Sequence, residues 1–443
     1  MNIRKYFGPL RVACALASVC GSVSAGGPCD IYAAAATPCV AAHSTTRALY
    51  ASYSGNLYQV RRKSDKAVKD IGLLTIGGVA NSADQDAFCA NTTCTISKIY
   101  DQSPKANHLV VTPAGGWLGH GGTEANATAA KIKLDGRTVY GVYTTGSFDT
   151  TVGGVGYRNN KTTGVATADQ PEGIYAVIDG KHYNQYCCFD YGNAETNNLD
   201  DGPATMEAIF YGNSTQWGKG SGTGPWVMAD LEDGLFAGES FLPPATNTTM
   251  SSAYVTAIVN GNSGNSWVIK GGDAQSGNLK TLYSGARPKG YSPMKKQGAI
   301  ILGVGGDNSH TGQGTFFEGC MTSGFPTDAT DAAVQANIVA AGYGRTTPSN
   351  AGTFQRARVF PSIHYDPSSA SARIGYALES PAQVRLRVVD LRGREIARLA
   401  DGHATEGHHE ATWNAAMTNS GMFAVVLDID GRNAWTGNFL AGR

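Results

Sequence analysis

The chain has 443 residues, in which 35 Lys and Arg side chains balance 35 Asp and Glu side chains, and charged residues make up only 16%. This neutral, weakly charged composition excludes a basic nucleic-acid-binding protein and an acidic tail protein. The 57 glycines have no three-residue period and lie among aromatic and β-branched residues, which excludes collagen and plain disorder.

The first 25 residues have the pattern of a signal peptide. Three basic residues precede an apolar run from Val12 to Val19, and Val23-Ser24-Ala25 offers small residues for cleavage. A lipid anchor on Cys20 is the alternative, but a lipobox usually has a smaller residue than Val19 at the preceding position. We expect a secreted, extracellular protein whose mature chain begins near residue 26.

Seven of the nine cysteines lie beyond this segment, and export permits disulfides to persist. Cys29 with Cys39 and Cys89 with Cys94 are local pairs, so we expect both to be bridged. Cys187, Cys188 and Cys320 remain, as an adjacent pair and a single cysteine. No spacing among the cysteines is typical of a zinc site, and we expect neither a metal nor an organic cofactor.

The body of the chain is predicted to be all-β. We expect one helix around residues 43–53 and another over 328–341, where Thr327 or Asp328 is the N-cap and Gly342 the stop. From about residue 170, short strand-like runs separated by Gly, Asn and Asp indicate a β-sandwich or jelly roll. These runs are 173–179, 205–212, 225–232, 253–261, 266–272, 298–306 and 315–325.

The last 90 or so residues differ in composition from the body. All 16 lysines lie at or before Lys296, whereas 10 of the 19 arginines lie between Arg356 and Arg443. In residues 383–399, apolar residues alternate with arginines up to a turn at Arg392-Gly393, which predicts a hairpin with one buried face. We therefore predict a signal peptide at 1–25, a main domain at 26–345, a linker at 346–353 and a separate domain at 354–443.

Two carboxylates lie close together in the strand-like segment 226–232. Strand alternation places Val227, Ala229 and Leu231 on one face and Met228, Asp230 and Glu232 on the other. Neighbouring like charges raise one another's pKa, which is useful where one carboxylate attacks and another holds a hydroxyl or a proton. The alternative is an ordinary solvated strand face.

A third carboxylate ends the apolar strand that begins near residue 298. Glycines at 303, 305 and 306 let another group approach the backbone just before Asp307. The alternative is an aspartate that only begins a turn. Paired with Glu232, however, Asp307 supplies the second carboxyl group that glycoside hydrolysis needs.

Six segments together give the chain a family resemblance: CDIYAAAATPCVAAHSTTRALYASYSG, CANTTC, KIYDQSPKANHL, YCCFDYGNAE, WVMADLEDGLF and ILGVGGDNS. They resemble the α-L-arabinofuranosidases of glycoside hydrolase family 54 over about residues 28–345. The resemblance implies a concanavalin-like β-sandwich and a retaining double displacement.

The resemblance also implies roles for individual residues. Glu232 corresponds to the nucleophile and Asp307 to the general acid/base, while Asp230 corresponds to a carboxylate that binds the arabinose hydroxyls. Cys187-Cys188 resembles the family's vicinal disulfide at the sugar site, with Tyr186 and Phe189 on either side, and the alternative is that one of them pairs with Cys320. Further residues expected to contact the sugar are Trp217, Asp233 and Gly306.

Two features depart from the family. Asp233 stands where the family commonly has asparagine. The C-terminal residues do not resemble the family's arabinose-binding β-trefoil; they resemble the small immunoglobulin-like sorting domains of bacterial type IX secretion. That resemblance implies a partner in the secretion machinery and attachment of the enzyme to a bacterial cell surface.

The sequence thus predicts a secreted, monomeric exo-acting α-L-arabinofuranosidase. Its expected substrates are arabinose-bearing plant cell-wall polysaccharides, arabinoxylan and arabinan. The alternatives are a non-catalytic carbohydrate-binding sandwich and an enzyme with mainly β-xylosidase activity.

Overall fold

The computed structural model divides into two compact units, Met1–Pro348 and Ser349–Arg443, and each unit is described by itself. The division falls within the predicted linker. The predicted signal peptide lies outside the described residues. The structure describes residues 26–149, 151–347, 362–366, 369–378, 382–390, 393–405, 407–414, 421–429 and 432–441.

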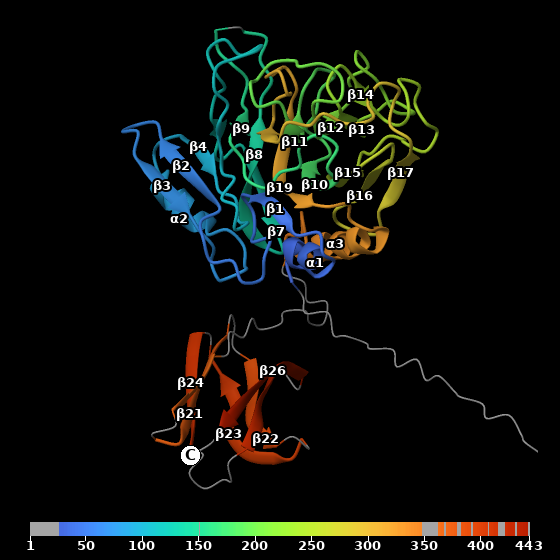
Figure 1. Ribbon diagram of the computed structural model, residues 1–443. Helices are drawn as coiled ribbons and strands as arrows, with labels where there is room; N and C mark the ends of the chain where they lie inside the picture. The colour runs from blue at the N-terminus through green and yellow to red at the C-terminus, as the bar shows by residue number, and fades with distance from the viewer. Residues whose placement is uncertain are drawn as a thin grey trace, which may run out of the picture. The chain divides into compact units, whose positions relative to one another are not determined.

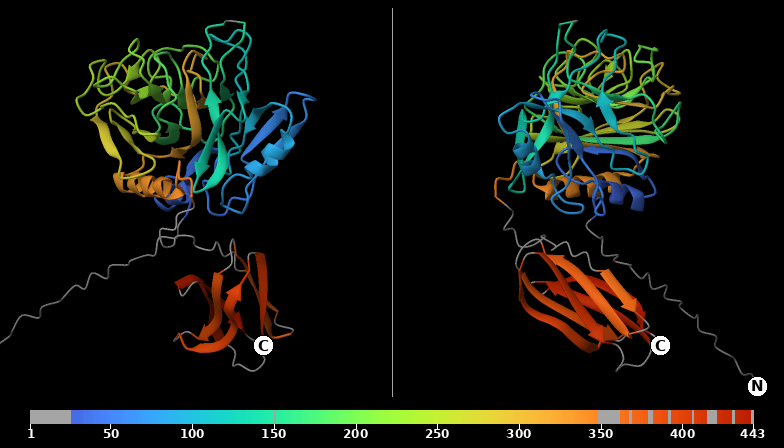
Figure 2. Two further views of the ribbon diagram at one scale, coloured as in Figure 1. Left: turned by 180° about the vertical axis from the view of Figure 1, so that it is seen from behind. Right: turned by 90° about the vertical axis from the view of Figure 1, so that its left-hand side faces the viewer.

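The first unit contains two antiparallel sheets packed face to face (Figures 1 and 2). The smaller sheet has the order β17-β16-β15-β10-β19-β8-β7, and β1 also pairs with β19. Its strands are β1 (Cys39–Ser44), β7 (Ala130–Leu134), β8 (Arg137–Thr144), β10 (Glu172–Asp179), β15 (Tyr254–Gly261), β16 (Trp267–Asp273), β17 (Lys280–Gly285) and β19 (Gly314–Ser323).

The larger sheet has the order β14-β13-β12-β11-β18-β9-β5-β4-β2-β3, and β6 also pairs with β4. Its strands are β2 (Tyr58–Arg62), β3 (Val68–Ile71), β4 (Cys94–Ile99), β5 (Leu109–Val111), β6 (Ala125–Asn126), β9 (Tyr157–Asn159), β11 (Asp190–Ala194), β12 (Glu207–Gly212), β13 (Trp226–Asp230), β14 (Leu235–Phe236) and β18 (Ala299–Leu302). Each of the seven predicted strand segments contains a strand of one of these two sheets, so the prediction of a sandwich is confirmed.

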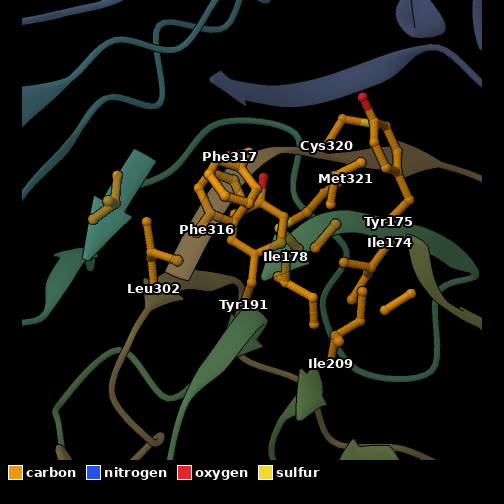
Figure 3. Packing of buried hydrophobic residues seen from close by; sticks show 14 of the residues in the cluster. Ile174, Tyr175, Ile178, Tyr191, Ile209, Leu302, Phe316, Phe317, Cys320 and Met321 are labelled. Carbon is orange, nitrogen blue, oxygen red and sulfur yellow. The ribbon is translucent and has the colours of Figure 1, made fainter. Parts of the chain in front are cut away.

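The core lies between the two sheets. Figure 3 shows Tyr191, Ile209 and Leu302 of the larger sheet against Ile178 and Phe316 of the smaller one. Removal of such side chains from water is the main force that holds the sheets together. The strands that carry the candidate site are therefore anchored on their inner face.

Three helices lie among the described residues: α1 (Pro28–Ala34), α2 (Ser82–Phe88) and α3 (Asp328–Ala341). The prediction of α3 is confirmed, because Thr327 accepts a hydrogen bond from the Thr330 N–H and Gly342 adopts a left-handed conformation at the C-cap. Val334 and Ile338 are buried, whereas Ala332 and Ala333 are exposed. None of the described helices is long and apolar enough to cross a membrane.

The predicted helix over residues 43–53 is wrong. His43 and Ser44 instead end strand β1, where they pair with Gly319 and Glu318 of β19. The buried imidazole of His43 also contacts the hydroxyl of Tyr191, 3.0 Å from Nδ1. Strand pairing thus replaces the expected start of the helix at residues 43 and 44, and residues 45–53 form bends and turns.

The second unit is a small β-sandwich of a three-stranded sheet, β20-β21-β24, and a four-stranded sheet, β23-β22-β25-β26. Val384, Leu386 and Val388 are buried between the sheets and Arg385 is half exposed, which confirms the predicted hairpin of β22 and β23. The strands are β20 (Ser362–Asp366), β21 (Ser371–Leu378), β22 (Ala382–Asp390), β23 (Glu395–Ala404), β24 (Gly407–Asn414), β25 (Gly421–Ile429) and β26 (Arg432–Ala441).

Candidate active site

A cavity of about 400 Å³ opens in the first unit where loops leave the strands of the larger sheet. Its wall contains all eight residues that the sequence singled out for catalysis or sugar binding. These are Cys187, Cys188, Trp217, Asp230, Glu232, Asp233, Gly306 and Asp307. The structure therefore brings together segments that are up to 120 residues apart in the sequence.

Asp230 and Glu232 lie where β13 ends. Val227, Ala229 and Leu231 point into the core between the sheets, as alternation predicts, so Asp230 points to the opposite face. Glu232 follows the strand with a φ of 63°, and its N–H donates to Oδ1 of Asp230 over 3.1 Å. Both side chains are largely buried, at 6% and 7% exposed, which rules out a solvated strand face.

Asp307 lies in a turn after β18 that is held by its neighbours. Oδ1 of Asp307 accepts a hydrogen bond from the Ser309 N–H over 2.8 Å, and its carbonyl accepts one from the Trp117 N–H over 3.0 Å. Arg158 in β9 donates to the carbonyl of Gly306 over 2.7 Å and to Oδ1 of Asn308 over 2.9 Å. The backbone on both sides of Asp307 is thus fixed.

Cys187 and Cys188 form a disulfide on the cavity wall. Sγ of Cys188 lies 3.3 Å from Oδ2 of Asp230, which places the disulfide directly beside the acidic groups. Tyr186 also lines the cavity, but Phe189 is 4% exposed and belongs to the core. Of the two residues that flank the disulfide in the sequence, only Tyr186 therefore reaches the cavity, because strand β11 begins immediately after Phe189 and the Phe189 side chain points between the sheets.

The other cysteines form the two predicted local bridges, Cys29–Cys39 and Cys89–Cys94, and Cys320 is a buried free thiol. Two groups of potential metal ligands lie close together among the described residues: Cys29, Cys39 and Cys320, and Cys187, Cys188 and Asp230. In each group two sulfurs belong to a disulfide and are not thiolates, so neither group offers the three ligands that a zinc site requires.

Two further carboxyl groups, which the sequence reasoning missed, lie behind the cavity. Asp190 begins β11 and Glu195 follows its last residue, and both are almost completely buried. Among the described residues, only another carboxyl group reaches the oxygens of Asp190 and Oε2 of Glu195: Asp190 interacts with Asp230, and Glu195 interacts with Glu232. The available signal was weak: an acid stands on each side of residues 191–194, but that segment contains both apolar and polar side chains.

Burial and mutual repulsion raise the pKa of these acids. Burial, followed by the charges of Asp230 and Glu195, raises the pKa of Glu232 to about 11. Burial also raises the pKa of Asp230 to about 7, and the pKa values of Asp190 and Glu195 are raised for the same reason. Because the carboxyl groups repel one another, the cluster holds fewer negative charges than it has carboxyl groups.

Aromatic side chains surround the mouth of the cavity. Trp117 is 70% exposed and Phe148 is 69% exposed, and the ring of Phe148 meets Tyr186 edge to face at a centroid distance of 4.7 Å. Trp217 is 45% exposed, and its carbonyl accepts a hydrogen bond from the Leu235 N–H over 2.8 Å. Large exposed aromatic rings beside polar groups are typical of ligand sites.

Comparison with known families agrees with this geometry. The family described as "Alpha-L-arabinofuranosidase B, catalytic" matches residues 28–344. The chain is 49% identical to "Probable alpha-L-arabinofuranosidase B" of Aspergillus fumigatus over 412 residues, which cover 91% of this chain and 77% of the relative. It is 50% identical to "Arabinofuranosidase/B-xylosidase" of Trichoderma koningii over 422 residues, covering 94% and 80%.

Two solved structures are also similar. A mutant of a GH54 α-L-arabinofuranosidase soaked with 4-nitrophenyl α-L-arabinofuranoside has a TM-score of 0.69 at 49% identity, covering 82% of this chain and 75% of that one. An arabinofuranosidase complexed with arabinofuranosyl-α-1,2-xylobiose has a TM-score of 0.69 at 48% identity, covering 83% and 75%.

The comparisons do not support the resemblance of the tail to a bacterial sorting domain. The family match ends at residue 344, before the second unit, and the two relatives described above come from Aspergillus and Trichoderma. The expected secretion-machinery partner and bacterial surface attachment are unsupported. The strands of the second unit form a small β-sandwich, and this fold by itself indicates neither a secretion partner nor surface attachment.

Proposed function

The chain belongs to the family of α-L-arabinofuranosidase B catalytic domains, and from this membership we propose that its cavity hydrolyses terminal, non-reducing α-L-arabinofuranosyl residues with retention of configuration. The observation that carries this proposal is the convergence of Asp230, Glu232 and Asp307 on one cavity. Retaining hydrolysis uses one carboxylate as a nucleophile and a second carboxyl group as acid and then base.

In the proposed reaction, the carboxylate of Glu232 attacks the anomeric carbon while Asp307 protonates the leaving oxygen. Water, deprotonated by Asp307, then releases arabinose from the glycosyl-enzyme. Asp230 accepts hydrogen bonds from the sugar hydroxyls, which strengthen as the ring flattens. Burial and the neighbouring acids raise the pKa of Glu232, so the proposed reaction requires another acid of the cluster to hold the proton and leave the negative charge on Glu232 when substrate binds.

The walls of the cavity suit an uncharged furanose ring. The Cys187–Cys188 disulfide offers an apolar surface, and Trp217, Asp233 and Gly306 also line the cavity. An apolar surface with a few directed polar groups is the usual composition of a sugar-sized site.

An aryl α-L-arabinofuranoside tests the proposed catalytic residues. We expect Glu232→Ala and Asp307→Ala each to lower kcat by about a thousandfold or more, as removal of a nucleophile or its acid/base partner does elsewhere. Azide should partly restore the activity of Glu232→Ala, because a small anion can occupy the space of the missing carboxylate and attack the anomeric carbon. Glu239→Ala, at an exposed acid outside the cavity, is the control.

If either cavity variant hydrolysed the substrate at the wild-type rate, the assignment would be overturned. If the wild type did not hydrolyse the substrate at all, a carbohydrate-binding sandwich would be favoured. One relative's name includes B-xylosidase, so an aryl β-D-xyloside belongs in the same assay. A higher kcat/KM on the xyloside would make β-xylosidase the main activity.

We further propose that the enzyme acts on side chains of arabinoxylan, and that Trp117, Phe148 and Tyr186 contact the polymer beyond the arabinose. One similar structure holds arabinofuranosyl-xylobiose, and exposed aromatic rings pack well on sugar faces. Trp117→Ala should raise KM for arabinoxylan severalfold and leave KM for the aryl arabinofuranoside unchanged. An equal effect on both substrates would contradict this role, and product analysis on branched arabinan would show whether that polymer is preferred.

Export and a monomeric state complete the proposal. Three disulfides in the first unit fit an oxidising compartment. The mature N-terminus near residue 26 is checked by mass spectrometry of the protein recovered from culture medium, and the monomer by its mass in solution.

A further inference from the structure

Glu195 is a buried acid that the proposed reaction does not use. Its side chain is 0% exposed, and Oε1 accepts a hydrogen bond from the hydroxyl of Thr205 over 2.5 Å. Besides the carboxyl group of Glu232, no possible donor reaches Oε2 among the described residues. One oxygen of this carboxyl group is therefore held in place, and the other is available to interact with a neighbouring group.

The free oxygen of Glu195 faces the proposed nucleophile across Gly306. A Cβ atom placed on Gly306 would clash with Oε2 of Glu195 and lie 2.7 Å from Oε2 of Glu232. The two carboxyl groups thus occupy the same small space, which only a residue without a side chain leaves open. Repulsion would be strong if both were ionised there.

Arg158 fixes the backbone around this pair without neutralising it through direct contact. Its Nη2 donates to the main-chain carbonyl of Glu195, and its Nη1 donates to that of Gly306 over 2.7 Å. Nε donates to Asn160 over 2.6 Å. Since these N–H groups contact carbonyl oxygens, the carboxylate of Glu195 receives no guanidinium hydrogen bond among the described contacts.

The charges around the pair also disfavour a second anion. Glu232 faces Asp230 at the end of β13, Asp307 after β18 and Asp200 in the loop before β12, besides Glu195. Arg158 is the cation whose charge acts on Glu195, Asp307 and Glu232. Among the described residues, Asp190 and Asp233 add to these acids, and this excess of acids over Arg158 favours retention of protons by the acids farthest from solvent.

We propose that Glu195 is a positioning residue that remains protonated and donates a hydrogen bond from Oε2 to Oε2 of Glu232. This bond holds the negative charge on Glu232 and points its other oxygen towards the sugar. The same donor stabilises the charge when Glu232 is released from the glycosyl-enzyme. The proposal rests on the nucleophilic role of Glu232 proposed above.

The pH dependence of kcat/KM tests this role, because its acid limb follows ionisation in the free enzyme. Glu195→Gln keeps a donor of the same length and cannot ionise, so we expect kcat within about threefold of wild type and an unshifted acid limb. Glu195→Leu keeps the size and removes the donor, so the acid limb should move up by about one pH unit or more. Thr205 then still donates to the carbonyl of Gly202 over 2.7 Å.

The opposite direction would overturn the proposal. If Glu195 were ionised, its replacement by either Gln or Leu would remove a repelling charge, and both acid limbs would move to lower pH. An unchanged limb in the Leu variant would also contradict it. A purely structural role would alter thermal stability and leave the limbs in place.

Infrared difference spectroscopy provides a readout that does not require activity. Glu195→Gln should remove one protonated-carboxyl band from the neutral-pH spectrum of the wild type. Persistence of every such band would overturn the proposal even if the variants were inactive. By contrast, failure of Glu232→Ala to lose activity would remove the proposed nucleophile while leaving the protonation of Glu195 measurable.

Discussion

Two buried acidic clusters lie on opposite faces of strand β12 and its neighbours, and they are built differently. In one, Lys296 contacts Glu172 and Glu207 at 3.0 Å each, and Arg287 contacts Glu207 at 2.7 Å. In the other, the cavity cluster, the acids face one another. Ala208 pairs with Asp230, so the adjacent Glu207 points to the opposite face of the sheet.

The pKa values follow from these partners and not from depth alone. Arg287 and Lys296 overcome burial and lower the pKa of Glu207 to about 2, whereas the cavity raises the pKa of Glu232 to about 11. Glu172, which has one cation to share, is intermediate, and burial raises its pKa to about 7. Buried acids that are paired with cations are therefore ionised and serve structure, whereas the cavity acids, without enough cations, share fewer negative charges than there are carboxyl groups.

The largest expected change in stability comes from breaking the paired cluster. Lys296→Met removes the shared cation and leaves Glu172 buried without it, which should cost about 3 to 5 kcal/mol of unfolding free energy. Urea denaturation of the first unit measures the loss. Lys295→Met, at the exposed neighbour, should have nearly the unfolding free energy of the wild type. Equal losses in both variants would show that the buried ion pairs of Lys296 are not the cause.

A smaller, pH-dependent effect compares the two clusters directly. The pKa of Asp230 is raised from 3.8 to about 7, so the wild type loses stability as the pH rises through that interval, and Asp230→Asn escapes the loss. Its advantage should grow between pH 4 and 7 to a few kcal/mol at most, since each pH unit in that interval contributes on the order of 1.4 kcal/mol.

Glu207→Gln should behave in the opposite way. The lowered pKa of Glu207 adds stability above about pH 4.5, and that stability is lost as the pH falls through about 2. The variant should therefore be least stable, relative to wild type, at neutral pH. Thermal unfolding midpoints measured across pH check both variants, and a change of the same sign in both would contradict the comparison.

The smallest effect is expected for an ion pair in solvent. Arg373 and Glu410 lie 3.3 Å apart in the second unit with side chains 69% and 59% exposed. Water screens such a pair, so Arg373→Ala should change stability by no more than about 0.5 kcal/mol. A larger decrease in the unfolding temperature of the second unit would show that solvent exposure alone does not distinguish weak ion pairs from strong ones.

Local pattern was sufficient for much of the fold and for the placement of the cavity residues. The two-residue period of residues 226–232 predicted that Asp230 lies on the face away from the core, because strand geometry fixes that alternation; Glu232 lies in the turn after the strand. The caps at Thr327 and Gly342 likewise located α3. The segment 43–53 misled, since its strand depends on β19, more than 270 residues away.

The second layer of the site could not be predicted in the same way. Arg158, Asp190 and Glu195 act through tertiary contacts, and neither their spacing nor their flanking residues show which acid they approach. Gly306 illustrates the limit: the sequence indicates an open backbone there, but only the structure shows that Glu195 and Glu232 share the space.

The backbone conformation of the turn after β13 affects how this protein can be engineered for thermal stability. Glu232 and Asp233 adopt φ values of 63° and 55°, a region that costs an ordinary residue about 1 kcal/mol or more and that glycine enters freely. Selection for resistance to heat alone would therefore reward glycine at 232, and with it the loss of the proposed nucleophile. Asparagine at 233 offers a milder route, because it tolerates the left-handed region and removes one charge while Glu232 stays in place.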